Sequence, residues 1–105
     1  MDKKDALKIA IKYLSFLKSE KKDIIKAYLF GSYAKCNPTD NSDIDIAIVF
    51  KNIKNKNFET QIQLLMLTTQ FDTRIEPHPF DKTDFNNNNP LVNEVLKTGI
   101  EIKLF

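Results

Sequence analysis

The sequence has 105 residues, of which 42% are hydrophobic, so it is long enough for one domain with a single apolar core. Its net charge of +2 comes from 16 basic and 14 acidic residues, and so small a charge gives no sign of direct nucleic-acid binding. The single cysteine, Cys36, excludes an internal disulfide framework and a cysteine-based zinc site. No apolar stretch approaches the roughly 20 residues that span a bilayer, and no signal-peptide layout is present. We therefore expect a cytoplasmic protein without membrane contact.

The first predicted element is an amphipathic helix over residues 5–19. Leu7, Ala10, Ile11, Leu14 and Leu17 recur at the spacing of one helical face. A second apolar stripe is formed by Ile9, Tyr13 and Phe16. The helix is therefore covered on two sides, either by the sheet and a neighbouring element or by the sheet and a partner protein.

Two apolar runs follow and predict strands, Ile24–Phe30 and Ile44–Phe50. The second run is almost continuously apolar, which favours a central position in the sheet. Gly31 ends the first strand because glycine adopts backbone angles closed to other residues. Residues 32–35 could then open a short helix with Ser32 at its N-cap, and residues 37–42 are typical of turns.

The second half of the chain repeats the alternation of helices and strands. A helix is predicted from Phe58 to near Phe71, a short or edge strand over 73–80 that contains Pro77 and Pro79, and a flexible loop over 81–89. Pro90 suits the first turn of a last helix that Gly99 ends, and residues 100–105 predict a final strand. The expected architecture is a single α/β (α+β) domain over residues 1–105, with a small mixed sheet flanked by helices.

Two carboxylates open the second strand. Residues i and i+2 of a strand point to the same face, so Asp43 and Asp45 lie side by side while Ile44, Ile46 and Ile48 take the other face. Two carboxylates this close repel each other unless a cation lies between them. Mg²⁺ prefers such oxygen ligands, and a pair of ions would suit an in-line phosphoryl displacement.

A third carboxylate is available at Glu76, within an apolar stretch where a charged group needs a reason to be desolvated. The same alternation puts Arg74, Glu76 and His78 on one face, so Arg74 could instead neutralise Glu76. His78 stands between two prolines, where packing or capping is a simpler explanation than a role as a base.

The turn after the first strand supplies the features of a phosphate site. Gly31 allows close approach to the backbone, the N-terminus of the predicted short helix offers free N–H groups and the Ser32 hydroxyl, and Lys35 could reach phosphate oxygens. No Gly-x-x-x-x-Gly-Lys motif occurs, so this is not a P-loop. Tyr33 could stack on a base or pack in the core.

Residues 29–32, Leu-Phe-Gly-Ser, followed by residues 42–49, Ser-Asp-Ile-Asp-Ile-Ala-Ile-Val, resemble the signature of the DNA polymerase β-like nucleotidyltransferase superfamily, and more closely its minimal nucleotidyltransferases. The resemblance implies the polymerase β-like fold, ATP as donor substrate and two Mg²⁺ ions. It also implies that Asp43, Asp45 and Glu76 are the catalytic metal ligands and that Gly31 and Ser32 hold the triphosphate. In one departure from the family pattern, Cys36 stands where relatives usually have glycine.

Many short chains of this family resemble antitoxins whose partner is a HEPN-domain toxin, a ribonuclease. The resemblance implies transfer of AMP from ATP to a tyrosine hydroxyl of the toxin, as in a type VII-like antitoxin. A chain of this length has no room for an acceptor-binding domain, which agrees with an external protein acceptor. One alternative is a non-catalytic antitoxin that neutralises its partner by occlusion, with a vestigial or regulatory nucleotide site. Another is modification of a small molecule, as by aminoglycoside nucleotidyltransferases.

Overall fold

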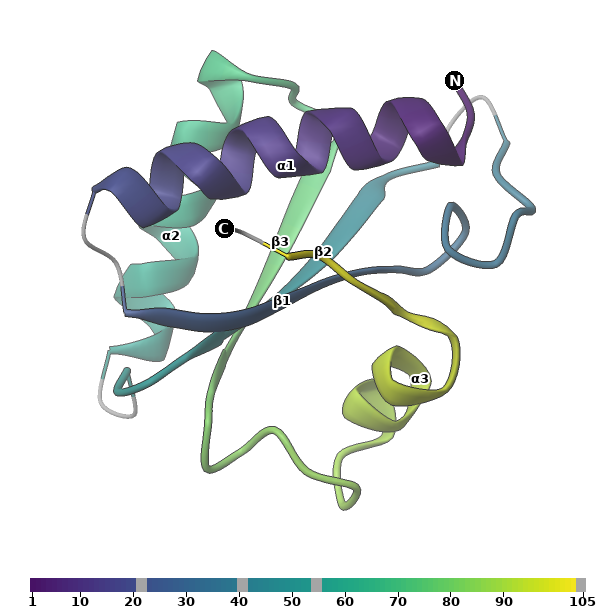
Figure 1. Ribbon diagram of the computed structural model, residues 1–105. Coiled ribbons are helices and arrows are strands. Elements are labelled where there is room, and N and C mark those ends of the chain that lie inside the picture. The colour runs from purple at the N-terminus through teal and green to yellow at the C-terminus, as the bar shows by residue number, and fades with distance from the viewer. Residues whose placement is uncertain (21–22, 40–41, 54–55, 104–105) are drawn as a thin grey trace.

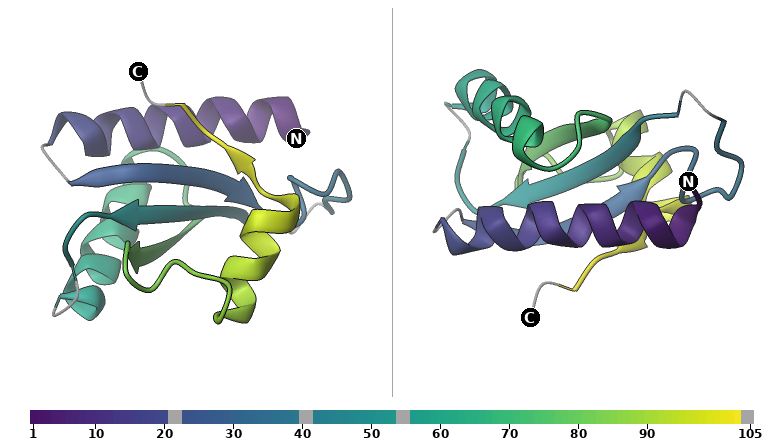
Figure 2. Two further views of the ribbon diagram at one scale, coloured as in Figure 1. Left: turned by 60° about the horizontal axis from the view of Figure 1, so that its bottom comes forward. Right: turned by 90° about the horizontal axis from the view of Figure 1, so that it is seen from above.

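The computed structural model describes residues 1–20, 23–39, 42–53 and 56–103. One mixed sheet has the strand order β3-β2-β1-β4, with α1 and α2 packed on one face and α3 on the other (Figures 1 and 2). This confirms the predicted mixed sheet flanked by helices. The elements are α1 (Lys3–Ser19), β1 (Ile24–Phe30), β2 (Ile44–Phe50), α2 (Asn57–Leu67) followed by a 3₁₀ turn (Thr68–Gln70), β3 (Ile75–Asp81), α3 (Pro90–Thr98) and β4 (Ile100–Glu101).

Helix α1 is covered on two sides within the chain itself. Asp2 caps it by accepting a hydrogen bond of 2.9 Å from the Asp5 N–H. Tyr13 is fully buried, donates from its hydroxyl to the Leu64 carbonyl of α2 at 2.7 Å, and packs edge-on against Phe71. Burial raises the pKa of the Tyr13 hydroxyl, so it stays a neutral donor. The second stripe of α1 is thus explained by α2 rather than by a partner protein.

The sheet places β2 in the predicted central position. It pairs antiparallel with β1 and parallel with β3, and it is buried along almost its whole length. Strand β3 lies at the sheet edge and has seven residues despite its prolines. Residues i and i+2 of a strand direct their N–H groups to the same side, so Pro77 and Pro79 remove donors from one side only. An edge strand tolerates that loss because only its other side has a partner.

The two faces of the sheet carry cores of unequal size. The larger cluster packs α1 and α2 against Ile44, Ile46 and Ile48, while the smaller one packs α3 against Tyr28, Phe30, Ala47, Val49 and Phe80. Each fully buried aliphatic side chain contributes about 1.5–3 kcal/mol, so most of the hydrophobic stabilisation lies on the α1/α2 face. The thinner α3 face leaves room for polar groups at the end of the sheet where β2 and β3 begin.

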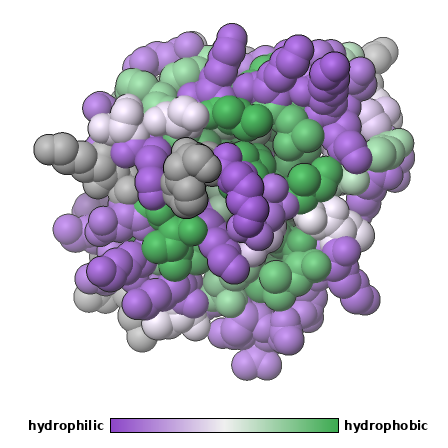
Figure 3. All heavy atoms as spheres, viewed as in Figure 1, coloured by the Kyte–Doolittle hydropathy of each residue, from purple (hydrophilic) through white to green (hydrophobic). Residues whose placement is uncertain are grey.

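Helix α2 has an apolar stripe that faces solvent. Phe58 is 76% exposed and Met66 68%, and Ile62 and Leu65 between them are also exposed. Leu64 and Thr68, on the opposite side of the same segment, are buried. Several of the apolar residues whose spacing predicted this helix are therefore not covered by the rest of the described chain. In the view of Figure 3, hydrophilic side chains dominate the outline and hydrophobic residues gather towards the middle.

The C-terminal elements close the smaller face. Residues 82–89 form turns rather than a helix or strand, and Asn89 caps α3 by accepting from the Leu91 N–H at 2.9 Å. Pro90 is at the first helical position, and Gly99 is at the C-cap, where a β-carbon would overlap the Val95 carbonyl oxygen. The predicted final strand is shorter than expected, because β4 pairs with β1 only at Tyr28 and Leu29. Residues 104–105, the end of that prediction, lie outside the described residues.

Among the residues that the structure describes, no helix has the length and apolar character that crossing a lipid bilayer requires.

Candidate active site

A tight turn follows β1 at the end of the sheet. Gly31 has φ +76°, and the next five residues are turns closed by bonds from Lys35 N–H to Gly31 O and from Asn37 N–H to Ser32 O, both of 3.1 Å. The predicted short helix over 32–35 is wrong. Cys36 has φ +60°, the left-handed conformation that terminates helices, so the coil ends after one turn.

Gly31 and Asp45 lie in contact across β1 and β2. Phe30 pairs with Asp45 in the sheet register, which brings the next residue, Gly31, against the Asp45 side chain. A β-carbon on Gly31 would overlap Oδ2 of Asp45. The glycine is therefore required twice, for its positive φ and for the space that the carboxylate occupies.

The predicted carboxylates converge at this end of the sheet. Asp45 is the register partner of Glu76 in the parallel β2–β3 pair, and Asp43 precedes β2 by one residue. Burial raises the pKa of Glu76, and the neighbouring Asp43 carboxyl raises that pKa further. The charged form of the Glu76 carboxyl is thus disfavoured in the absence of a cation.

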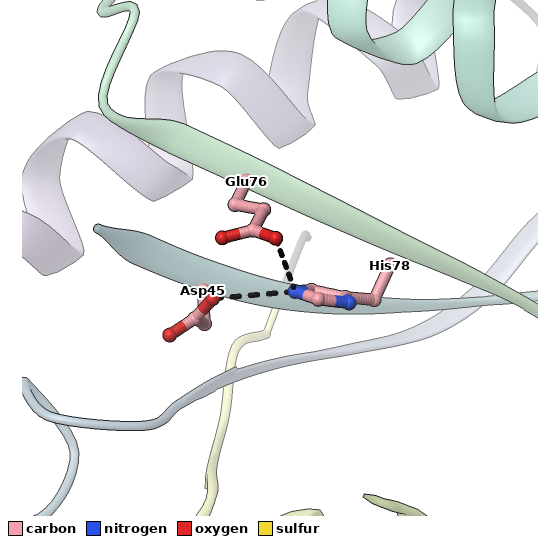
Figure 4. A group of neighbouring side chains, drawn as sticks. All are labelled: Asp45, Glu76 and His78. Atoms are coloured by element: carbon pink, nitrogen blue, oxygen red, sulfur yellow. Dashed lines mark hydrogen bonds and ion pairs between the residues drawn. The ribbon is translucent and has the colours of Figure 1, made fainter.

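His78 lies beside the carboxylates, although the sequence alone did not assign this residue to the site. Its Nε2 lies 3.2 Å from Oδ1 of Asp45 and 3.9 Å from Oε1 of Glu76, and the dashed lines of Figure 4 join these atoms. Possible ligand atoms of Asp45, Glu76 and His78 all lie within 4.8 Å of one another. The available signal was the strand alternation that put Glu76 and His78 on one face. Because His78 stands between two prolines, packing alone could explain its presence.

Arg74 does not neutralise Glu76. Its guanidinium instead donates to Asp72, from Nε at 2.9 Å and from Nη2 at 2.6 Å. This pairing holds the pKa of the Asp72 carboxyl below its usual range. The competing explanation for Glu76, a structural ion pair with Arg74, is therefore contradicted by the geometry.

The other predicted site residues are less directly engaged. Lys35 is exposed and forms a 3.1 Å ion pair with Glu94 of α3, a partner that the sequence did not indicate. Ser32 is partly buried in the turn beside Gly31, whereas Tyr33 is buried in the larger core cluster and is a packing residue. A cavity of about 600 Å³ lies between Pro79, Asp84, Asn88 and Pro90, and its lining includes none of the three carboxylates.

The donor set fits a divalent cation. Asp45 and Glu76 offer carboxylate oxygens within 4.8 Å of each other, Asp43 lies beside Glu76, and the space that Gly31 leaves free is filled by the Asp45 carboxylate. Mg²⁺ binds carboxylate oxygens together with substrate phosphates, and the turn over residues 31–36 lies next to Asp45. The arrangement suits a metal-dependent reaction of a phosphorylated substrate.

Fold and site together define a nucleotidyltransferase-type domain. Residues 12–104 match the family described as Polymerase beta, Nucleotidyltransferase. Because that match covers most of the 105 residues, the chain belongs to the polymerase β nucleotidyltransferase family.

Solved structures share this fold. A candidate nucleotidyltransferase from Sulfolobus solfataricus matches with a TM-score of 0.69 and 23% identity, over 94% of this chain and 80% of that one. A mutant of the toxin–antitoxin MntA–HpeT matches with a TM-score of 0.62 and 24% identity, over 88% of this chain and 69% of that one. A toxin–antitoxin with AMP-PNP matches with a TM-score of 0.54 and 21% identity, over 90% of this chain and 70% of that one. No curated protein matched the sequence.

Proposed function

We propose that this chain transfers AMP from ATP to a tyrosine hydroxyl of a partner toxin of the HEPN class, and so acts as a type VII-like antitoxin. The observation that carries the proposal is the register of Asp45 with Glu76, next to the turn that Gly31 opens. Membership of the nucleotidyltransferase family supports the reaction type. The fold shared with MntA–HpeT, and with a toxin–antitoxin that binds AMP-PNP, supports the partner and the donor.

In the proposed reaction, Gly31 and Ser32 hold the triphosphate, and Lys35 exchanges its ion pair with Glu94 for a phosphate oxygen. Asp43, Asp45 and Glu76 would hold two Mg²⁺ ions, which supply charge neutralisation of the phosphates. The acceptor hydroxyl oxygen forms a bond to the α-phosphorus, and the bond to the leaving pyrophosphate breaks. One of the metal-bound carboxylates, Glu76 in this proposal, accepts the hydroxyl proton.

The direct test is incubation with ATP labelled at the α-phosphate, Mg²⁺ and the protein encoded by the adjacent gene. We expect label on a tyrosine of that partner and none when Asp43→Asn and Asp45→Asn are combined. Lys103→Gln, a change at an exposed lysine that pairs with Glu101, serves as the control that retains labelling. Absence of label from the partner, or labelling that survives the double substitution, would refute the proposed transfer.

Neutralisation by occlusion is a second candidate, favoured by the exposed apolar stripe of α2. Phe58, Ile62, Leu65 and Met66 lie on the helix that packs on the opposite face of the sheet from the carboxylates. Contiguous exposed apolar surface is typical of protein contacts, and binding there needs no chemistry. If the doubly substituted aspartate variant still protects cells from the partner, occlusion is the function. If the variant still binds the partner but no longer protects cells, transfer of AMP is the function.

A further inference from the structure

We propose that His78 is a nitrogen ligand of this metal site, so that the site has a mixed nitrogen and oxygen donor set. Such a set binds a first-row transition-metal ion more tightly than Mg²⁺. The inference rests on the proposed function only in placing a metal ion at Asp45 and Glu76. It adds a ligand, and a metal preference, that the three carboxylates alone do not imply.

The separations suit ligands of one ion. Neighbouring ligands of an octahedral ion with bonds of about 2.1 Å are roughly 3 Å apart. Nε2 of His78 and Oδ1 of Asp45 are 3.2 Å apart, which is close to that edge length, and Oε1 of Glu76 is 3.9 Å from the same nitrogen. Ligand atoms of all three side chains lie within 4.8 Å of one another, and the Glu76 side chain is half exposed, so packing does not hold it at its present distance.

The imidazole is already oriented towards the carboxylates. His78 lies two residues after Glu76 on β3, so both side chains project from the same face of the strand. The ring packs against Phe30 of β1 with its centroid 5.0 Å away, and its side chain is 22% exposed. Figure 4 shows Nε2 directed between the two carboxylates. A ligand that packing holds in place binds an ion at a lower entropic cost than a free side chain does.

The nature of the donor decides which ion is preferred. Mg²⁺ takes oxygen ligands, whereas imidazole nitrogen suits transition metals, whose affinities rise from Mn²⁺ through Co²⁺. If His78 served only as a positive counter-ion for Asp45, an arriving cation would repel it and the ring would turn away. The two roles therefore predict opposite effects of removing the imidazole: weaker binding of Co²⁺ if His78 is a ligand, and equal or tighter binding if it is a counter-ion.

Because His78 is the only histidine in the sequence, the metal environment can be read without ambiguity in protein that carries no polyhistidine tag. Pulsed EPR of Mn²⁺ bound to the nucleotide-free protein should show coupling to one directly bound ¹⁴N nucleus. The coupling should change to that of ¹⁵N when histidine alone is labelled. Manganese that binds without nitrogen coupling overturns the inference, and this measurement needs no substitution at the site.

Calorimetric titration with Co²⁺ and with Mg²⁺ gives a second readout. His78→Gln and, as a smaller alternative, His78→Asn should weaken Co²⁺ binding by about tenfold or more and change Mg²⁺ binding by less than about twofold. Lys103→Gln removes a cation away from the site and controls for charge. Unchanged Co²⁺ affinity in a folded His78 variant overturns the inference. Asp45→Asn tests the metal site on which both proposals depend. Unchanged metal binding in that variant would refute both proposals, whereas weaker binding in Asp45→Asn with unchanged Co²⁺ binding in the His78 variants would refute only the role of His78.

Discussion

The carboxylate of Asp45 occupies the space where a side chain on Gly31 would begin. This contact joins the turn that follows β1 to the first residues of β2, and therefore the predicted phosphate site to the predicted metal site. A tightly packed interior transmits a change of one methyl group. The site therefore requires Gly31 for the space that Asp45 fills as well as for its positive φ.

Gly31→Ala should lower the free energy of unfolding by about 1–3 kcal/mol, because it strains a positive φ and displaces Asp45. Asp45→Ala empties the space, so Gly31→Ala should cost less in that background. Urea denaturation of the two single variants and the double variant measures the coupling. Strictly additive effects would show that the carboxylate and the added methyl group do not compete.

Cys36→Gly should stabilise the chain by about 1 kcal/mol. Cys36 has φ +60°, a conformation that costs a residue with a side chain about 1–2 kcal/mol. Ala34→Gly in the same turn is the matched control, and it should be destabilising because it only adds backbone freedom. Equal effects of the two substitutions on the urea midpoint would contradict the explanation.

Leu64 and Leu65 are adjacent in α2 but have opposite environments. Leu64 is fully buried and Leu65 is 53% exposed. Leu64→Ala should lower stability by about 2–5 kcal/mol, and Leu65→Ala by less than about 0.5 kcal/mol. Thermal unfolding at several protein concentrations measures both. A large, concentration-dependent effect of Leu65→Ala would mean that another copy of the chain covers the stripe.

Asp72→Asn should lower stability at pH 7 by about 1 kcal/mol, since Asn keeps the shape but loses the charge that Arg74 pairs with. The pKa of Asp72 is lowered in the fold, so its contribution is present above the unfolded-state pKa of about 3.9 and is lost as the pH falls through the lower folded value. Stability curves of the two proteins should therefore converge in acid. A difference independent of pH would point to a cause other than charge.

In metal-free protein, Glu76→Gln should raise the free energy of unfolding at pH 7, whereas Asp72→Asn should lower it. The pKa of Glu76 is raised by burial and by Asp43, so the fold disfavours its charged form, and stability falls as the pH rises from about 4.3 through the raised folded value. The variant should match the original chain in acid and exceed it at pH 7 by less than about 1 kcal/mol, because the side chain is half exposed. Unfolding in EDTA across pH measures this. A variant that is less stable at pH 7 would contradict the predicted repulsion.

Local patterns in the sequence were sufficient for much of the fold. The strands Ile24–Phe30 and Ile44–Phe50 match their predicted bounds because a short, mostly apolar run bounded by polar residues has the length of a strand rather than of a helix. Two-residue alternation also placed Asp45 opposite Ile44 and Ile46, whose side chains join the larger core. The short helix after Gly31 was predicted wrongly because a left-handed Cys36 leaves no pattern in the residues around it.

By itself, the sequence determined which residues could form the site: Gly31, Asp43, Asp45 and Glu76 stand at the ends of recognisable strands, and strand geometry follows from local chemistry. Only the tertiary structure decided which side chains meet. Pairing between β2 and β3, distant in the sequence, brought Glu76 and His78 to Asp45 and left Arg74 with Asp72. Register between strands depends on the packing of the whole core, and no short stretch of sequence encodes it.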